Sequence, residues 1–295
     1  MTDVVWSEFC CDLCGTDEAI EIEVLRRYSG GMPIHVCRNC GFVYVRRRRT
    51  AQVIAEVWSK ELFQADYTAR IPAVKARQLY VAETIDVELG LKGKALCDIG
   101  GGEGQFLEMV MGPEYGAKVF TIEPSPENCQ RLNRSGIEYF LGTIEDFRAS
   151  PKRDQITFDI VTIMWTLESC QDCRGMLKVA WEMLPTGGHL VIATGSRLLV
   201  PFKKPLQGYV RTNPTDAHPF RFSANTLRAM LAVCGFETTF INRYLDSDYL
   251  CVIGRKLEND TKVPWKGDDY RQVLDFFIRW DKESREHYSD FVYCP

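Results

Sequence analysis

The chain has 295 residues, of which 45% are hydrophobic and 26% charged, and its net charge is −4. This balance is typical of a globular protein and disfavours a large nucleic-acid-binding surface, which usually makes a domain basic. No run of 18 apolar residues is present and the first residues lack the pattern of a signal peptide, so no membrane span or membrane partner is expected. We therefore expect a cytoplasmic protein whose 12 cysteines stay reduced and serve metal binding or chemistry.

The first element in chain order is a pair of C-x-x-C-G motifs. Cys11 and Cys14 form one pair and Cys37 and Cys40 the other, with 22 residues between the pairs. A two-residue gap lets both thiolates reach one ion, and the glycine that follows lets the backbone turn without a Cβ clash. Two such pairs predict a tetrahedral site for a structural zinc in a small ribbon over residues 1–50.

Four consecutive arginines, Arg46 to Arg49, end this ribbon. They indicate either a patch that binds nucleic acid or phosphate, or a solvated strand end that enters a linker. We favour the solvated strand end because no other basic cluster lies near these arginines in the sequence. Residues 51–92 are then predicted to form a helical linker between the ribbon and the next domain.

Residues 93–257 alternate between predicted strands and helices. Strands are expected at 94–100, 117–124, 137–144, 158–168, 187–195, 237–245 and 248–257. Helices are expected at 104–112, 126–136, 173–184 and 223–236. This alternation predicts an α/β fold with a mostly parallel sheet and helices on both faces. In such a sheet, ligands bind beyond the carboxyl ends of the strands.

A glycine loop follows the first of these strands, in the stretch "CDIGGGEGQF". The dinucleotide pattern G-x-G-x-x-G fails, because the residue at its third glycine position is Gln105. A phosphate-binding P-loop fails as well, because no Gly-Lys-Ser/Thr follows. The pattern that fits is Asp98-x-Gly100-x-Gly102-x-Gly104, in which an acidic residue precedes the glycines.

Acidic residues lie at the ends of two predicted strands near this loop. Asp98 is poorly placed to receive a pyrophosphate but well placed to receive an ammonium group. Glu123 ends the next strand, where its carboxylate can accept both hydroxyls of a ribose. Thr143, Ile144 and Glu145 follow the third strand and are expected to flank an adenine. These groups match a nucleoside that carries an amino acid, which predicts S-adenosylmethionine as the cofactor.

Over about residues 90–257, the chain resembles class I S-adenosylmethionine-dependent methyltransferases. The resemblance rests on the successive motifs "LCDIGGGEGQF", "FTIEPS", "FDIVTIMWTLES", "LPTGGHLVIAT" and "FRFSANTLRAMLAVCGFE". It implies a Rossmann-like core with a seven-stranded, mostly parallel sheet, and transfer of a methyl group. It also implies that the linker folds over the cofactor, with Tyr67 close to it.

The cysteine motifs in front of the core are similar to those of a group that includes sugar C-methyltransferases, which implies a sugar or nucleotide-sugar acceptor. Members of that group usually carry a long second C-terminal domain, whereas this sequence runs for only about 40 residues beyond the core. The family often has the pattern His-x-Leu-Glu-His at the fourth strand. This chain has Trp165 to Ser169 there, without a histidine, so the acid–base roles of those histidines are not carried over.

The acceptor is expected to bind near the long segment 197–223, which follows the fifth strand and is rich in proline and aromatic residues. His218 is its only histidine, and it is either a base for the acceptor or an anchor that pins the segment to the helix at Ser223. Glu168 is the second candidate catalytic residue. Trp165 lines the cofactor pocket or serves packing alone.

Four other residues carry weaker signals. Tyr209 and Arg211, in the same long segment, are candidates to contact an anionic acceptor. Cys170 and Cys173 form a third C-x-x-C motif, but no second pair answers it, so we expect ordinary thiols.

Four domains follow: a zinc ribbon (1–50), a helical linker (51–92), the methyltransferase core (93–257) and a helical extension (258–295). The leading hypothesis is methyl transfer to a small molecule, with a sugar or nucleotide-sugar as the first candidate acceptor. One alternative is an RNA methyltransferase that binds RNA with the ribbon and the arginines. Another is a non-enzymatic interaction protein on a methyltransferase-like core, which the intact glycine loop and its acidic neighbours disfavour.

Overall fold

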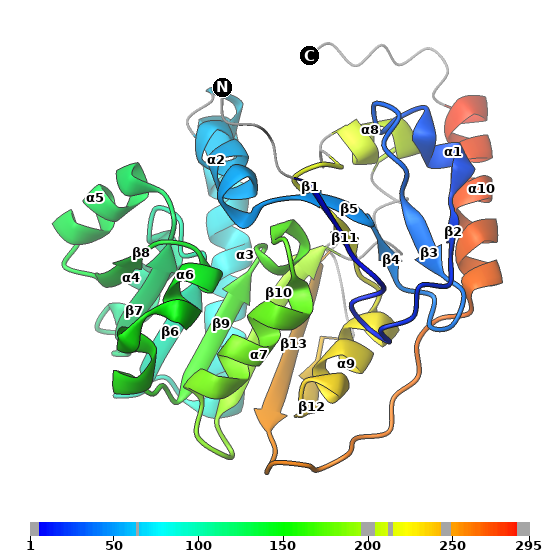
Figure 1. Cartoon of the computed structure of the whole chain (residues 1–295). Coiled ribbons are helices and arrows are strands. Elements are labelled where there is room, and N and C mark those ends of the chain that lie inside the picture. The colour runs from blue at the N-terminus through cyan, green and yellow to red at the C-terminus, as the bar shows by residue number, and fades with distance from the viewer. Residues whose placement is uncertain (1–5, 63–64, 196–203, 212–214, 243–248, 288–295) are drawn as a thin grey trace.

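The computed structural model describes the chain in five stretches, with the side chains of residues 60–71 and 249 left outside the description. These stretches are residues 6–62, 65–195, 204–211, 215–242 and 249–287. Within them, no helix is both long and apolar enough to cross a membrane. The elements form a large central sheet with helices on both faces, and a smaller N-terminal ribbon beside it (Figure 1).

Seven strands form the central sheet, in the order β12-β13-β10-β9-β6-β7-β8. They are β6 (Ala95–Ile99), β7 (Lys118–Glu123), β8 (Glu138–Leu141), β9 (Ile160–Met164), β10 (His189–Gly195), β12 (Phe236–Ile241) and β13 (Tyr249–Lys256). The strands from β10 to β8 are parallel, whereas β13 runs antiparallel to both of its neighbours, as its reversed arrow shows in Figure 1. The predicted mostly parallel, seven-stranded sheet is therefore confirmed.

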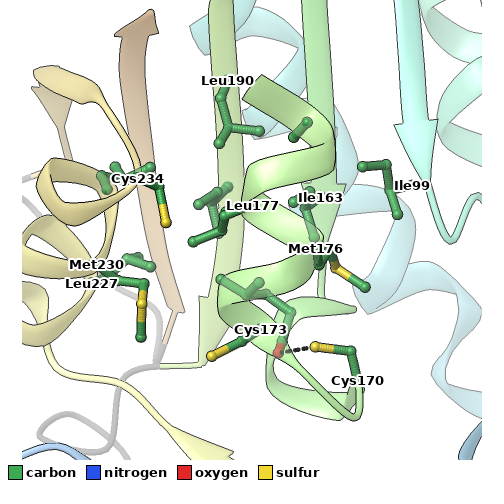
Figure 2. Packing of buried hydrophobic residues seen from close by; sticks show 14 of the residues in the cluster. Ile99, Ile163, Cys170, Cys173, Met176, Leu177, Leu190, Leu227, Met230 and Cys234 are labelled. Carbon is green, nitrogen blue, oxygen red and sulfur yellow. Dashed lines mark hydrogen bonds between the residues drawn. The ribbon is translucent and has the colours of Figure 1, made fainter. Parts of the chain in front are cut away.

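Helices cover both faces of this sheet because neighbouring strand residues point to opposite sides. Leu96 packs into the core under α3 (Ala65–Leu89), α4 (Gln105–Met111) and α5 (Pro126–Arg134). Cys97 packs into the opposite core, under α6 (Ile144–Ala149), α7 (Cys173–Met183) and α9 (Ala224–Val233). Figure 2 shows this second core, where Leu177 of α7 lies near Ile163 of β9, and Leu227 lies beside Met230 on α9.

The N-terminal ribbon is built from short strands and one short helix. They are β1 (Trp6–Glu8), β2 (Ala19–Glu21), α1 (Glu23–Arg26), β3 (His35–Cys37), β4 (Val43–Tyr44) and β5 (Arg47–Arg49). A strand from the long segment after β10 joins it: β11 (Phe220–Arg221) pairs with β4, which gives the sheet order β11-β4-β3-β2. The ribbon sheet therefore includes residues from beyond position 200. The division into four domains stays a prediction.

The C-terminal helix α10 (Tyr270–His287) packs on the ribbon rather than on the central sheet (Figure 1). Its buried residues Phe277 and Trp280 share an apolar cluster with Val36 of β3 and with Leu206 of α8 (Leu206–Arg211). The ring of Trp280 lies 5.1 Å from that of Tyr209. The apolar face of the predicted helical extension is therefore covered within this chain.

Arg48 joins the ribbon to the core. Its guanidinium is 1% exposed and donates to the carboxylate of Asp12 over 2.8 and 2.5 Å. It also donates to the backbone oxygen of Gln171, which follows β9, over 2.8 Å. The rings of Phe9 and Phe220 lie 4.4 and 4.5 Å from the guanidinium carbon. One buried cation thus holds together the first cysteine motif, the loop after β9 and β11.

The expectation that the arginine run is a solvated strand end is therefore wrong for Arg48. Asp12, a partner 36 positions away in the sequence, neutralises it in the interior. Arg46 pairs with Asp17 and Arg49 with Asp216, so these two arginines also have acidic partners. Three of the four arginines that would form a nucleic-acid-binding patch are therefore paired with acidic residues of the same chain.

We predict that Arg48→Ala lowers the free energy of unfolding by about 3–5 kcal/mol, because it leaves the buried carboxylate of Asp12 without its cation. The control is Arg46→Ala, which breaks a solvent-exposed pair and should cost about 1 kcal/mol or less. Urea unfolding followed by circular dichroism measures both. Equal losses in the two variants would contradict the proposed role of Arg48.

Candidate functional site

A cavity of about 400 Å³ lies beyond the carboxyl ends of β6, β7 and β9. Its remaining walls come from α2 (Ala51–Leu62), from α3 and from the residues around β11. Nine of the site residues expected from the sequence line it: Gly100, Gly102, Glu123, Thr143, Ile144, Glu145, Trp165, Glu168 and His218. The structure therefore brings together seven of the ten expected cofactor residues and the two expected catalytic residues.

The glycine loop needs its glycines for two reasons. Gly100, Gly102 and Gly104 all have positive φ angles of 81°, 57° and 86°, which L side chains rarely adopt. A Cβ at Gly100 would also lie 2.5 Å from the hydroxyl of Thr166, whereas one at Gly102 would enter open space. The backbone of Gly102 is therefore the part of the loop that a ligand can approach closely. Gly104 packs against Leu132 and precedes α4 instead of lining the cavity.

Glu123 ends β7 and is held firmly at the cavity wall. Its carboxylate accepts hydrogen bonds from the backbone of Gly102 at 2.8 Å, the backbone of Ser125 at 2.9 Å and the amide of Asn128 at 3.2 Å. Burial raises the pKa of this carboxyl, and the three hydrogen bonds oppose that shift. Two carboxylate oxygens offer about four acceptor positions, so capacity remains for a ligand hydroxyl.

Asp98 lies behind the glycine loop and is 2% exposed. The hydroxyl of Thr162 donates to it over 2.6 Å. Burial raises the pKa of Asp98 to about 7, although the bond from Thr162 works in the opposite direction. Asp98 is not among the described residues that line the cavity. Its proposed contact with an ammonium group stays a prediction.

The expected adenine-flanking residues open helix α6. Thr143 caps this helix, since its hydroxyl accepts from the backbone of Asp146 and the carboxylate of Asp146 accepts from the backbone of Thr143. The cap fixes Ile144 and Glu145 at the cavity wall. Burial raises the pKa of Glu145. Their contact with adenine stays a prediction that this placement supports.

The end of β9 carries strained and buried groups. Trp165 has a φ of 54°, which is uncommon for a residue other than glycine, and its backbone N–H donates to Ala193 over 2.7 Å. Glu168 follows in the short helix η2 (Leu167–Ser169), where it is 4% exposed. Burial raises its pKa, and its atom Oε2 has no hydrogen-bond partner among the described residues. Such unpaired polar groups concentrate at functional sites.

His218 faces the cavity from the residues just before β11. Its Nδ1 lies 3.2 Å from the hydroxyl of Ser169, and its ring stands edge-on to Trp58 at 6.3 Å. The indole of Trp58 donates to the neighbouring carbonyl of Ala217 over 2.8 Å. Burial, aided by the nearby cation of Arg221, moves the pKa of His218 well below 6.5. The imidazole is therefore neutral at pH 7.

Two expectations around the long segment need correction, and the one for Tyr67 stays a prediction. His218 does not anchor the segment to the helix at Ser223, because the hydroxyl of Ser223 donates to Asp268 over 2.6 Å and takes part in the cap of α9. Tyr209 is buried against Trp280, and Arg211 is exposed, so neither lines the cavity. Tyr67 lies in α3, but its side chain is outside the described part of the structure.

Sequence reasoning missed the residues that α2 and α3 contribute. Trp58 of α2 and Arg77 and Gln78 of α3 line the cavity. The signal that could have found them was weak: an aromatic residue and a basic residue within a linker already expected to fold over the cofactor. Helical spacing alone did not show which face of the linker would meet the site.

The four expected metal ligands form a compact cluster. The Sγ atoms of Cys11, Cys14, Cys37 and Cys40 all lie within 4.8 Å of one another. Cys11 and Cys40 are 3.5 Å apart, as are Cys14 and Cys37. A tetrahedral ion with metal–sulfur bonds of about 2.3 Å places its sulfurs roughly 3.8 Å apart, so the cluster fits zinc.

The model of the methyltransferase-domain family matches residues 73–239, which is more than half of the chain. The chain belongs to this family. It is an S-adenosylmethionine-dependent methyltransferase, as the class I resemblance implied.

Relatives and structures of known proteins agree with this family. The ubiquinone/menaquinone biosynthesis C-methyltransferase UbiE of Vibrio cholerae is 26% identical over 232 residues, which cover 68% of this chain and 87% of UbiE. An S-adenosylmethionine-dependent methyltransferase of Thermotoga maritima superimposes with a TM-score of 0.51 at 19% identity, covering 69% of this chain and 99% of that one. Human N-acetylserotonin methyltransferase gives 0.50 at 18% identity, covering 65% of this chain and 55% of that one. The two structures support the family's fold.

We predict that Glu123→Ala weakens binding of S-adenosylhomocysteine about tenfold or more. The variant removes the proposed ribose acceptor, and one charge-assisted hydrogen bond contributes about 1.5–3 kcal/mol, which corresponds to about tenfold or more in affinity. Isothermal titration calorimetry measures the affinity. Glu138→Ala, an exposed change on the neighbouring strand β8, is the control and should bind normally. Unchanged affinity in Glu123→Ala would remove Glu123 from the cofactor site.

Proposed function

We propose that this methyltransferase modifies a small molecule, with His218 as the base that takes a proton from it. The observation that carries the proposal is the continuity of the cavity. It extends from Gly102 and Glu123, the proposed cofactor half, to Trp58 and His218 on the other side. Its volume of about 400 Å³ falls in the range of small-molecule sites.

The comparisons bear on the acceptor class. UbiE is named for quinone biosynthesis and the human neighbour for N-acetylserotonin, both small molecules. Neither name supports the expected sugar or nucleotide-sugar acceptor, so the proposal stops at a small molecule. RNA as acceptor is disfavoured, because the arginine run that would bind it is largely paired within the chain.

S-adenosylmethionine, when bound, supplies a methyl group already activated on a sulfonium sulfur. The protein's task is therefore to align an acceptor for in-line attack and to remove a proton where the acceptor carries one. In the tautomer in which Nδ1 of His218 donates to the hydroxyl of Ser169, Nε2 keeps a free lone pair. The edge-on ring of Trp58 fixes the imidazole from a second side.

The direct test screens small molecules and RNA as acceptors of a radiolabelled methyl group from S-adenosylmethionine. The proposal expects transfer to small molecules alone. Transfer to RNA without transfer to small molecules would contradict it.

We predict that His218→Asn lowers kcat by about 10²–10⁴-fold, the usual contribution of one acid–base group. Affinity for S-adenosylhomocysteine should stay nearly intact, because His218 lies on the acceptor side of the cavity. Ser169→Ala, which removes only the hydroxyl beside Nδ1, should cost less. Turnover of His218→Asn within about a factor of three of the unmodified enzyme would end the catalytic assignment, and Glu168 would then be mutated next.

The pH dependence of kcat/KM gives a separate prediction. A base works in its neutral form, and the pKa of His218 lies well below 6.5. Activity should therefore be constant near neutral pH and fall only as the pH drops through that lower pKa. His218→Asn should lose this acid limb. An acid limb centred near pH 7 that survives in His218→Asn would assign it to another group.

We also propose that the cysteine cluster holds a structural zinc. Gently purified protein should contain one zinc per chain, and less than about half an equivalent by metal analysis would contradict this. Cys37→Ser should lower both zinc content and thermal stability, because an incomplete site loses folding free energy. Cys10→Ser is the matched control. The thiol of Cys10 is exposed and lies outside the cluster, so its loss should change neither quantity.

A further inference from the structure

Arg77 brings a cation into the cavity. It belongs to α3, and its guanidinium carbon lies 4.8 Å from the centre of the Trp165 ring. Its atom Nε is buried and has no hydrogen-bond partner among the described residues. Its cation acts on the carboxyl of Glu168, where it opposes the rise that burial gives to the pKa of that group. A buried donor of a charged group without a partner is costly, which points to a ligand that completes it.

Other unpaired polar atoms belong to residues of the same cavity. Oε1 of Gln78, the neighbour of Arg77 in α3, and Oε2 of Glu168 are buried without a hydrogen-bond partner among the described side chains. Both residues line the cavity. Glu123, by contrast, already accepts three hydrogen bonds at the proposed cofactor side. Oε1 of Gln105, beside the glycine loop, is also buried without a partner among the described residues, so unpaired polar atoms line the glycine-loop wall as well as the α3 wall.

The guanidinium of Arg77 matches an anion, whereas the unpaired oxygens of Gln78 and Glu168 match hydrogen-bond donors on the same ligand. A guanidinium offers parallel N–H donors that match a carboxylate or a phosphate, and stacking on an indole holds its plane in a fixed orientation. Burial raises the pKa of Glu168, whereas hydrogen bonds from Thr194 and Gly195 and the cation of Arg77 lower it, so burial disfavours the negative charge of this carboxyl beside a bound anion. Trp58 and Trp165 add apolar ring surface for the body of the ligand.

We propose that Arg77, stacked on Trp165, binds an anionic group of the methyl acceptor, a carboxylate or a phosphate. The acceptor class is then an organic anion with a flat apolar body. This inference rests on the proposed small-molecule function and narrows it. It transfers the role of anion contact from Tyr209 and Arg211, which do not line the cavity, to a residue that does.

The first experiment separates the acceptor from the cofactor, which carries a carboxylate of its own. Calorimetry compares Arg77→Gln with the unmodified protein for S-adenosylhomocysteine and for 5′-methylthioadenosine, which lacks the amino-acid part. Affinities for both within about twofold of the unmodified protein are expected. A loss of tenfold or more for S-adenosylhomocysteine alone would assign Arg77 to the cofactor carboxylate and overturn the inference.

The second experiment titrates protein loaded with S-adenosylhomocysteine with 4-hydroxybenzoate, phenyl phosphate and the neutral 4-hydroxybenzamide. At least one anion should bind about tenfold more tightly than the amide. The anion with the higher affinity shows whether a carboxylate or a phosphate is the preferred group. Arg77→Gln should remove this preference. Lys75→Gln, which changes an exposed cation on the same helix, should keep it.

The inference is overturned if the amide binds as tightly as the anions, if Arg77→Gln retains the preference, or if neither anion binds. These outcomes leave methyl transfer to a small molecule intact. Failure of the unmodified protein to bind S-adenosylhomocysteine would instead contradict the proposed cofactor half of the cavity. The two proposals therefore fail in different ways.

Discussion

The position of the proposed acceptor side of the cavity depends on the hydrogen bonds of one buried group, the guanidinium of Arg48. Asp12 lies inside the first cysteine motif, and the carbonyl of Gln171 belongs to the loop that continues from Glu168 and Ser169. Arg48 bonds to both, so the cysteine cluster and the cavity wall share one buried cation. A buried pair of this kind contributes less to net stability than to fixing one arrangement of the groups around it, a role we infer here from its three-way bonding.

The ribbon also reaches the site through the backbone. Phe220 of β11 pairs with Tyr44 of β4, and the backbone of Val45 donates to Pro219 over 2.9 Å. His218 immediately precedes these residues. The position of the proposed base is thus set by the ribbon, whereas the proposed cofactor residues sit on strands of the central sheet. The strands of the methyltransferase core thus position the glycine loop and Glu123, whereas the ribbon and the linker helices form the proposed acceptor side of the cavity.

Much of the cofactor half could be predicted from the sequence, because its residues follow local rules. The glycine loop and Glu123 each end a strand, and parallel strands bring their carboxyl ends to one edge. The cysteine spacing likewise predicted that the four thiols would cluster. Arg48 could not be assigned in this way, since its partners lie 36 and 123 positions away and a charged run is ordinarily solvated. Two further features depend on residues far apart in the sequence: Phe220 pairs with Tyr44, and Arg77 lines the cavity. The periodicity of the sequence predicts neither of them.

The most direct test of the role of Arg48 is hydrogen–deuterium exchange on Arg48→Lys. This variant keeps the positive charge but lacks the guanidinium N–H groups that donate to Asp12 and to the carbonyl of Gln171 at the same time. We predict faster amide exchange at residues 167–173 and 215–222, and an unchanged exchange rate in the strands β6, β7 and β8. Exchange that changes only within the ribbon, at residues 6–50, would contradict it, because the cavity wall would then hold its place without Arg48.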